Sequence, residues 1–189
     1  MSATALLVCD IQNGIIERLT NHDTKTYLQQ VAKSIEGARE AGIKVFYVRV
    51  AFRPGHPEAS PRNASVARAK SWGGFVEGDQ STQIHDAIAP SEEDIVVTKR
   101  RGSAFHATDL DLLLRSLRID TLVICGLSTS GVVMSTVRQG SDMDYNFVVL
   151  EDLCLDPDQA MHDACLQVLA KQAQMVESAD WLAGLGVQN

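Results

Sequence analysis

The chain has 189 residues, of which 45% are hydrophobic and 22% charged, a composition typical of a globular protein, so we expect a single domain over residues 1–189. The formal net charge of −7 disfavours nucleic acid as a partner, and no apolar run approaches the roughly 20 residues that span a membrane. The first residues lack the basic segment of a signal peptide, which predicts a cytoplasmic protein without a nucleic-acid or membrane partner.

Six short runs rich in β-branched residues alternate with stretches of helical periodicity. The predicted strands are residues 5–10, 43–50, 94–99, 121–125, 146–150 and 174–177. The predicted helices are residues 24–41, 110–117, 130–143 and 157–171. Strands that alternate with helices form parallel sheets covered on both faces, so the sequence predicts an α/β fold with three layers and a six-stranded parallel sheet flanked by helices.

The segment of residues 51–84 interrupts this alternation. It contains the turn-forming run of residues 53–57 and is too long for a plain connection in a compact domain. Loops of this length usually serve as lids or binding loops, although a surface insertion without a function is the alternative. Trp72 and Phe75 lie on this segment and either line a pocket or anchor the loop on the core.

Polar residues follow the strands at the sheet edge where parallel α/β proteins bind ligands. Asp10 ends the first predicted strand, with Gln12 close behind it, and Lys99 ends the third. A carboxylate beside an ammonium in a partly desolvated cleft can move a proton, because each group sets the pKa of the other. The alternative is a buried ion pair that only fixes the register of the strands. Arg100, which follows Lys99, is expected to be a solvated surface charge.

A turn of small residues, 126–131, joins the fourth strand to the next helix. Backbone N–H groups at a helix N-terminus suit a carboxylate or an oxyanion, and Ser128 and Thr129 add hydroxyl groups. The alternative is that these hydroxyls are ordinary helix caps. The four cysteines lie in apolar segments without metal-ligand spacing, which predicts reduced and mostly buried thiols.

Three motifs in this order resemble the isochorismatase-like hydrolase superfamily. They are residues 10–13, residues 99–105, and residues 126–129. The resemblance runs over nearly the whole chain and implies an isochorismatase-like, Rossmann-like fold, a hydrolase activity and a homodimer or homotetramer. It also implies that Asp10 and Lys99 are catalytic.

Most members of the superfamily attack an amide with a cysteine, and the matching position here is Val132. Isochorismatases proper also lack this thiol, and their Asp acts as a general acid on a vinyl ether. Arg101, close to Lys99, then suits a substrate that bears a carboxylate. The turn departs from theirs at Ser128 and Ser130, where they have an aromatic residue and a His, and at Val132, where they have Gly. The metal ligands of nicotinamidases are absent apart from His56, so we expect neither a metal nor another cofactor.

The sequence therefore predicts a hydrolase that acts on a small carboxylate- or carbonyl-bearing metabolite through Asp10 and Lys99, without a thioester. One alternative is an amidohydrolase with a relocated nucleophile such as Cys125. The other is an inactive ligand-binding protein, which Val132 favours and the intact Asp10 and Lys99 disfavour. The predicted substrate-binding residues are Gln12, Trp72, Phe75, Arg101, Ser128, Thr129, Gly131 and Val132.

Overall fold

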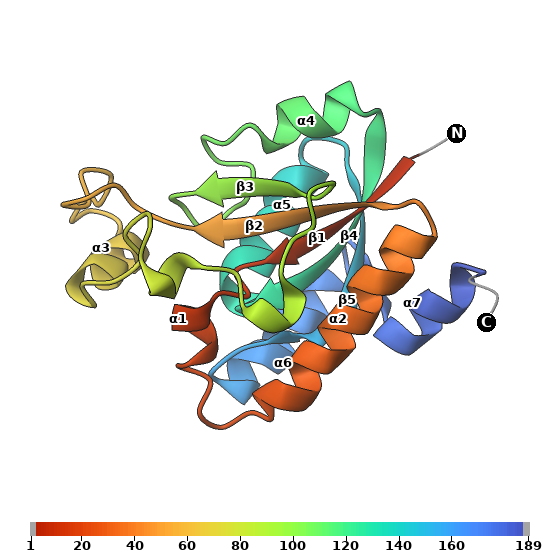
Figure 1. Ribbon diagram of the computed structural model, residues 1–189, viewed down its shortest axis with the longest axis horizontal. Coiled ribbons are helices and arrows are strands. Elements are labelled where there is room, and N and C mark those ends of the chain that lie inside the picture. The colour runs from red at the N-terminus through yellow and green to blue at the C-terminus, as the bar shows by residue number, and fades with distance from the viewer. Residues whose placement is uncertain (1–2, 187–189) are drawn as a thin grey trace.

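The sheet has six strands, all parallel, in the order β3-β2-β1-β4-β5-β6, in a computed structural model that describes residues 3–186 (Figure 1). The strands are β1 (Ala3–Cys9), β2 (Lys44–Val50), β3 (Ile95–Lys99), β4 (Ile119–Leu127), β5 (Asn146–Leu155) and β6 (Gln174–Val176). The predicted α/β class and six-stranded parallel sheet are confirmed. β4 and β5 run further toward their carboxyl ends than expected, which moves the residues at the sheet edge.

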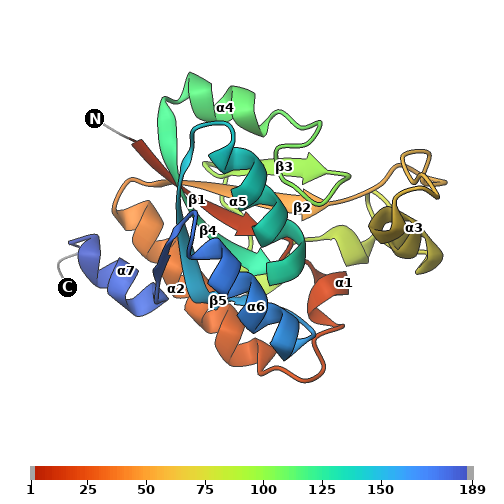
Figure 2. The ribbon, with the colours of Figure 1, turned by 180° about the vertical axis from the view of Figure 1, so that it is seen from behind.

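Helices cover both faces of the sheet. The helices are α1 (Asn13–Ile16), α2 (Thr24–Glu40), α3 (Ala64–Ser71), α4 (Leu110–Ser116), α5 (Met134–Ser141), α6 (Gln159–Leu169) and α7 (Ser178–Gly184). α2 and α7 lie on one face, and α5 and α6 lie on the other with α4 above them (Figures 1 and 2). A π-helical turn, Thr129–Val133, leads into α5, and none of the helices within residues 3–186 is long and apolar enough to cross a membrane.

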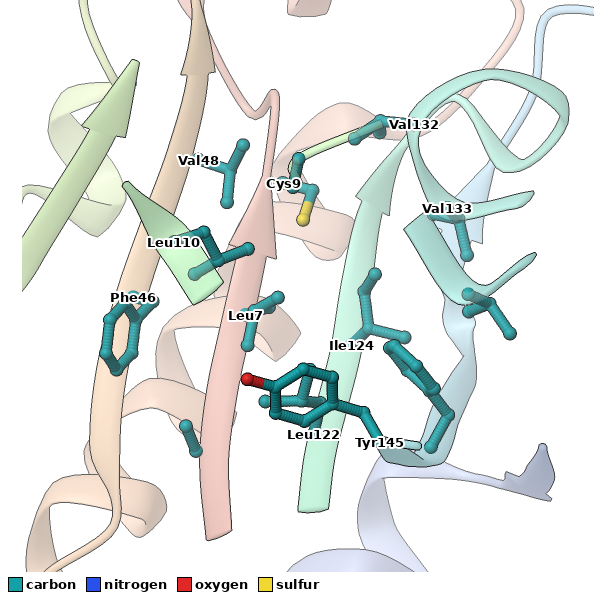
Figure 3. Close-up of a cluster of buried hydrophobic side chains, with 14 of the residues drawn as sticks. Leu7, Cys9, Phe46, Val48, Leu110, Leu122, Ile124, Val132, Val133 and Tyr145 are labelled. Atoms are coloured by element: carbon teal, nitrogen blue, oxygen red, sulfur yellow. The ribbon is translucent and has the colours of Figure 1, made fainter. Parts of the chain in front are cut away.

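The central strand β1 is buried on both sides because its side chains alternate between two apolar layers. Leu7 and Cys9 enter the layer under α4 and α5, and Leu6 and Val8 enter the layer under α2. Figure 3 shows the first of these layers, where Cys9 of β1 lies beneath Val132 of the π-helical turn. This buried apolar layer supports the carboxyl ends of the strands.

The expected long loop carries a helix of its own. Asn63 caps α3, because its side-chain oxygen accepts a hydrogen bond from the backbone N–H of Val66 at 3.2 Å. Phe52, Val66 and Phe75 form a small apolar cluster under α3, separate from the two main layers. The segment therefore folds around its own core at the carboxyl end of the sheet, where Figure 1 shows α3 projecting beyond β2.

β1 and β4 approach each other so closely at Gly126 that no side chain fits at this position. Its φ of 146° lies outside the range of ordinary side-chain-bearing residues, and an added Cβ would overlap the carbonyl oxygen of Cys9. We expect Gly126→Ala to lower the free energy of unfolding by about 3 kcal/mol, measured by urea denaturation. Gly184→Ala is the control, since open space surrounds that position. Equal stability of the two variants would contradict the packing described here.

Candidate active site

A cavity of about 630 Å³ opens at the carboxyl ends of the strands. Its wall combines Asp10 after β1, Lys99 at the end of β3, the turn after β4 and residues 155–157 after β5. Side chains of α1 and α3 complete it, so the inserted segment closes one side. A concave, mostly apolar space with a few convergent polar groups is the usual form of a small-molecule site.

Asp10 and Lys99 meet in this cavity as a buried ion pair. The Oδ2 atom of Asp10 lies 2.7 Å from Nζ of Lys99, and the two residues are only 5% and 4% exposed. β2 lies between their strands and holds Asp10 in place, because the Asp10 backbone N–H donates to the carbonyl of Val48 at 2.8 Å. Nζ of Lys99 also donates to the carbonyl of Arg101 at 3.0 Å, which fixes its direction.

The other oxygen of Asp10 has no partner. Oδ1 is buried and accepts no hydrogen bond from any of the described residues. Burial raises the pKa of Asp10 above its ordinary value, and the charge and hydrogen bond of Lys99 oppose this increase. The buried, unpartnered oxygen and the raised pKa suit a carboxylic acid that exchanges a proton with a bound molecule.

The turn after β4 is held by side chains rather than left open. The backbone N–H of Ser130 donates to Oδ2 of Asp156 at 2.9 Å, and its hydroxyl donates to the same oxygen at 2.6 Å. The N–H of Gly131 donates to the hydroxyl of Ser128 at 3.1 Å. Two of the amide groups expected to bind an anion therefore already have acceptors, and Ser128 acts as a cap.

None of the four thiols reaches the cavity. Cys9, Cys125, Cys154 and Cys165 are all buried, and none is among the residues that line the wall. Burial raises the pKa of Cys9 and Cys125 well above the ordinary thiol value and that of Cys154 to about 12. Val132, which the resemblance of the motifs aligns with the family's nucleophile, is 2% exposed and forms part of the wall. None of the four thiols is therefore placed in the wall of this cavity.

The structure brings most of the predicted site residues together. The cavity wall includes Asp10, Trp72, Phe75, Lys99, Arg101, Ser128, Gly131 and Val132. Their roles in binding and catalysis stay predictions. No group of three or more His, Cys, Asp or Glu side chains in the described part of the chain is placed to hold a metal ion.

Gln12 and Thr129 do not line the cavity, which corrects their expected placement. The Gln12 amide is fully buried: its Nε2 donates to the carbonyls of Val50 and Thr82, and its Oε1 accepts from the N–H of Val50 at 2.8 Å. The hydroxyl of Thr129 lies 2.8 Å from Nδ1 of His162 on α6. Both side chains hold loops together, because their polar atoms are directed at neighbouring segments rather than at the cavity.

Arg100 is also placed differently from the expectation of a solvated charge. Its guanidinium pairs with Glu58 at 3.0 Å and with Glu77, and both partners lie on the inserted segment. Arg101 donates to the carbonyl of Glu58 at 3.1 Å. The loop that follows Lys99 therefore holds the inserted segment against the cavity.

Arg18 and Asp156 are among the wall residues that were not predicted from the sequence. Asp156 was missed because β5 was expected to end at residue 150, five residues before its observed end. Strand length is set here by pairing with β4, which the sequence of β5 alone does not reveal. Arg18 follows α1 in a stretch without strand or motif signals, and only the fold of the inserted segment brings it to the cavity.

Comparison with known proteins supports the resemblance of the three motifs. The family described as Isochorismatase domain matches residues 4–180. The chain is 31% identical to the isochorismatase family protein YecD of Escherichia coli O157:H7 over 184 residues, which are 94% of this chain and 93% of that protein. It is 31% identical to the ureidoacrylate amidohydrolase RutB of Azorhizobium caulinodans, over 79% of this chain and 74% of RutB.

A solved structure shows the same architecture. N-carbamoylsarcosine amidase from Thermoplasma acidophilum superposes with a TM-score of 0.75 at 28% identity, over 93% of this chain and 96% of that one. The resemblance therefore covers the whole sheet and its flanking helices rather than an isolated motif.

The buried ion pair predicts a pH-dependent loss of stability when Lys99 is replaced. Lys99→Met leaves the Asp10 carboxylate buried without a counter-charge, and we expect a loss of about 3 kcal/mol near neutral pH. Because the folded-state pKa of Asp10 is raised, the folded protein binds that proton more tightly, and the associated stability is lost as the pH rises through the raised pKa. Urea denaturation should therefore show a larger deficit at about pH 8 than at about pH 5.

The double variant Asp10→Asn/Lys99→Met is the matched control. It removes both charges, so most of the stability should return and its pH dependence should resemble that of Asp10→Asn. A deficit in Lys99→Met that is the same at both pH values would contradict a charge-based origin.

Proposed function

The chain belongs to the isochorismatase family of hydrolases, and on that premise we propose that it hydrolyses a small carboxylate- or carbonyl-bearing metabolite by acid–base chemistry at Asp10, without a covalent enzyme intermediate. One observation carries the proposal: Asp10 lines the cavity, one of its oxygens is buried without a partner among the described residues, and Lys99 holds the other oxygen. A purely structural ion pair has no evident need for a free oxygen at that position.

The reaction needs a proton donor and one water molecule. Burial favours the protonated form of Asp10, which gives its proton from Oδ1 to the substrate atom next to the carbon that water attacks. Water then adds to that carbon, and one proton of the water returns to the Asp10 carboxylate. The adduct breaks its bond to the leaving oxygen or nitrogen, which takes the proton of the newly added hydroxyl group. The ammonium of Lys99, 2.7 Å from Oδ2, stabilises the carboxylate during the interval between the two proton transfers at Asp10.

A second candidate is an amidohydrolase with an oxygen nucleophile. RutB and the carbamoylsarcosine amidase, to which the chain is similar, are named for amide substrates. In this chain the hydroxyl of Ser130 lines the cavity and donates to the buried Asp156 carboxylate at 2.6 Å. The same carboxylate also accepts the Ser130 backbone N–H, so the contact is equally that of a turn held in place. The buried thiols argue against a relocated cysteine.

The decisive variants are Asp10→Asn, Cys125→Ser and Ser130→Ala. Hydrolysis of a panel of enol ethers, ureido acids and amides that carry carboxylates would be followed by proton NMR. We expect Asp10→Asn to reduce kcat by about 10³-fold, because it removes the proton donor while keeping the shape. We expect Cys125→Ser to keep the activity, since that thiol lies outside the cavity.

Each contrary result identifies a different alternative. Loss of turnover with Ser130→Ala, together with an enzyme-bound acyl group in the mass spectrum, would replace the non-covalent mechanism by the oxygen-nucleophile candidate. Ligand-induced increases in Tm without turnover across the panel would support the inactive ligand-binding protein.

The pH dependence of turnover supplies a separate prediction. A general acid works only while it carries its proton, so kcat/KM should fall as the pH rises through the raised pKa of Asp10. The midpoint should lie above the ordinary carboxyl value of 3.8, in stopped assays buffered across the acid and neutral range. A rate that instead rises with pH through that range would assign Asp10 the role of a base.

A further inference from the structure

We infer that the substrate is a carboxylate with an apolar body and that Arg18, which lies over the rings of Trp72 and Phe75, is the residue that binds its anionic end. The inference deepens the proposed function and rests on it, because it names the substrate class of the same cavity. It is carried by the charge of the cavity wall, by the partners of each basic side chain, and by the position of Arg18.

The cavity is basic although the chain is acidic. The formal net charge of the chain is −7, yet five basic side chains and only two acidic ones line the cavity. The basic residues are Arg18, Arg68, Lys99, Arg100 and Arg101, and the acidic residues are Asp10 and Asp156. A wall of this sign in a concave space attracts an anion and repels a cation.

Three of the five basic side chains are already engaged. Lys99 pairs with Asp10, Arg100 pairs with Glu58 and Glu77, and Arg101 donates to the backbone carbonyls of Arg100 and Glu58 at 2.6 and 3.1 Å. The sequence-based assignment of the substrate carboxylate to Arg101 therefore loses its main support, because two nitrogens of that guanidinium hold the loop.

Arg18 and Arg68 remain available. Neither forms an ion pair with a carboxylate in the part of the chain that the structure describes. The N–H groups of Ser130 and Gly131 in the facing turn are taken by Asp156 and Ser128. The groups expected to bind an anion are therefore the side chains of Arg18 and Arg68 rather than these two amides of the turn.

The position of Arg18 is fixed by aromatic rings. Its guanidinium carbon lies 4.7 Å from the centre of the Trp72 ring and 5.3 Å from that of Phe75, and one nitrogen donates to the carbonyl of Gly14. A guanidinium held close to two aromatic rings has restricted freedom, and its remaining N–H groups can bind a carboxylate with two hydrogen bonds.

Arg68 lies on the same side of α3 as Trp72. The Trp72 backbone N–H donates to the Arg68 carbonyl at 3.2 Å, one turn away along the helix. Arg68 therefore adds a second positive charge near the indole. Trp72 is 51% exposed, which places this basic and aromatic corner toward solvent, where a substrate enters.

Most of the remaining cavity wall is apolar and fits a ligand larger and less polar than an inorganic anion. Its apolar side chains include Ile15, Leu19, Phe52, Val66, Val132 and Leu155. An occupant that buries this surface gains roughly 25 cal/mol per Å² of apolar area, which a small inorganic anion cannot supply. The wall therefore fits a molecule with an apolar body and one charged end.

The test compares two probes of the same shape and different charge, 3-phenylpropionate and 3-phenylpropionamide. Binding is measured by calorimetry in the Asp10→Asn/Lys99→Met background, which prevents turnover without freeing the Lys99 ammonium to bind the carboxylate. We expect the carboxylate to bind more tightly than the amide, and Arg18→Gln to weaken the carboxylate by about tenfold or more while changing the amide by less than about threefold. Carboxylate binding should also weaken with added salt, because Arg18 is exposed.

Arg62→Gln is the matched control, since Arg62 is an exposed arginine just before α3 that does not line the cavity. It should leave the binding of both probes unchanged. Quenching of Trp72 fluorescence in a Trp181→Phe variant, where Trp72 is the remaining tryptophan, locates the probe at this corner.

The inference is overturned if Arg18→Gln weakens both probes equally, weakens neither, or matches Arg62→Gln. Its failure is distinguishable from that of the proposed function. Turnover that depends on Asp10 but not on Arg18 contradicts the inference alone. Carboxylate-selective binding through Arg18, without turnover by the unaltered protein, contradicts the proposed function alone.

Discussion

The contact between Asp10 and Lys99 is the constraint on which the rest of the site depends. A carboxyl group and an amine are each costly to bury, and the fold accepts both because parallel pairing of β1, β2 and β3 delivers them to one edge of the sheet, 2.7 Å apart. Below them lies a rigid apolar layer, shown in Figure 3, which removes water and raises the pKa of Asp10. The same low polarity that makes the pair unfavourable to bury also raises the pKa of Asp10, so that its carboxyl group can hold and release a proton.

The other parts of the cavity divide the remaining tasks. Val132 contributes a packed apolar side chain to the wall, and none of the four thiols lines it. Asp156 and Ser128 hold the amide groups of that turn. The inserted segment brings aromatic rings against Arg18, and the ion pairs of Arg100 attach this segment to the loop that follows Lys99. The loop after β3 therefore connects the proposed catalytic pair at the sheet edge with the inserted segment that is proposed to bind the substrate.

The sequence was enough to predict those elements whose structure is determined by the local pattern of residues. Apolar runs identified all six strands, and the rule that ligands bind at the carboxyl ends of parallel strands brought Asp10 and Lys99 together before any coordinates. The sequence did not predict the placement of side chains whose contacts are made with residues far along the chain. Gln12 is only two residues from Asp10 in sequence, but its amide hydrogen-bonds to the backbone of Val50 and Thr82 and does not line the cavity. Arg18 enters the wall only because Trp72 folds over it, a contact that no spacing signals.

The titration of the Asp10 carboxyl group tests the central claim most directly. Carbon-13 NMR of protein labelled at the aspartate carboxyl groups, with the Asp10 signal assigned by its loss in Asp10→Asn, follows this one proton as the pH changes. The account predicts that Asp10 titrates clearly above the ordinary value of 3.8 and moves higher still when Lys99 is replaced by Met. A carboxyl group that titrates at or below 3.8, or that does not respond to the loss of Lys99, would contradict it.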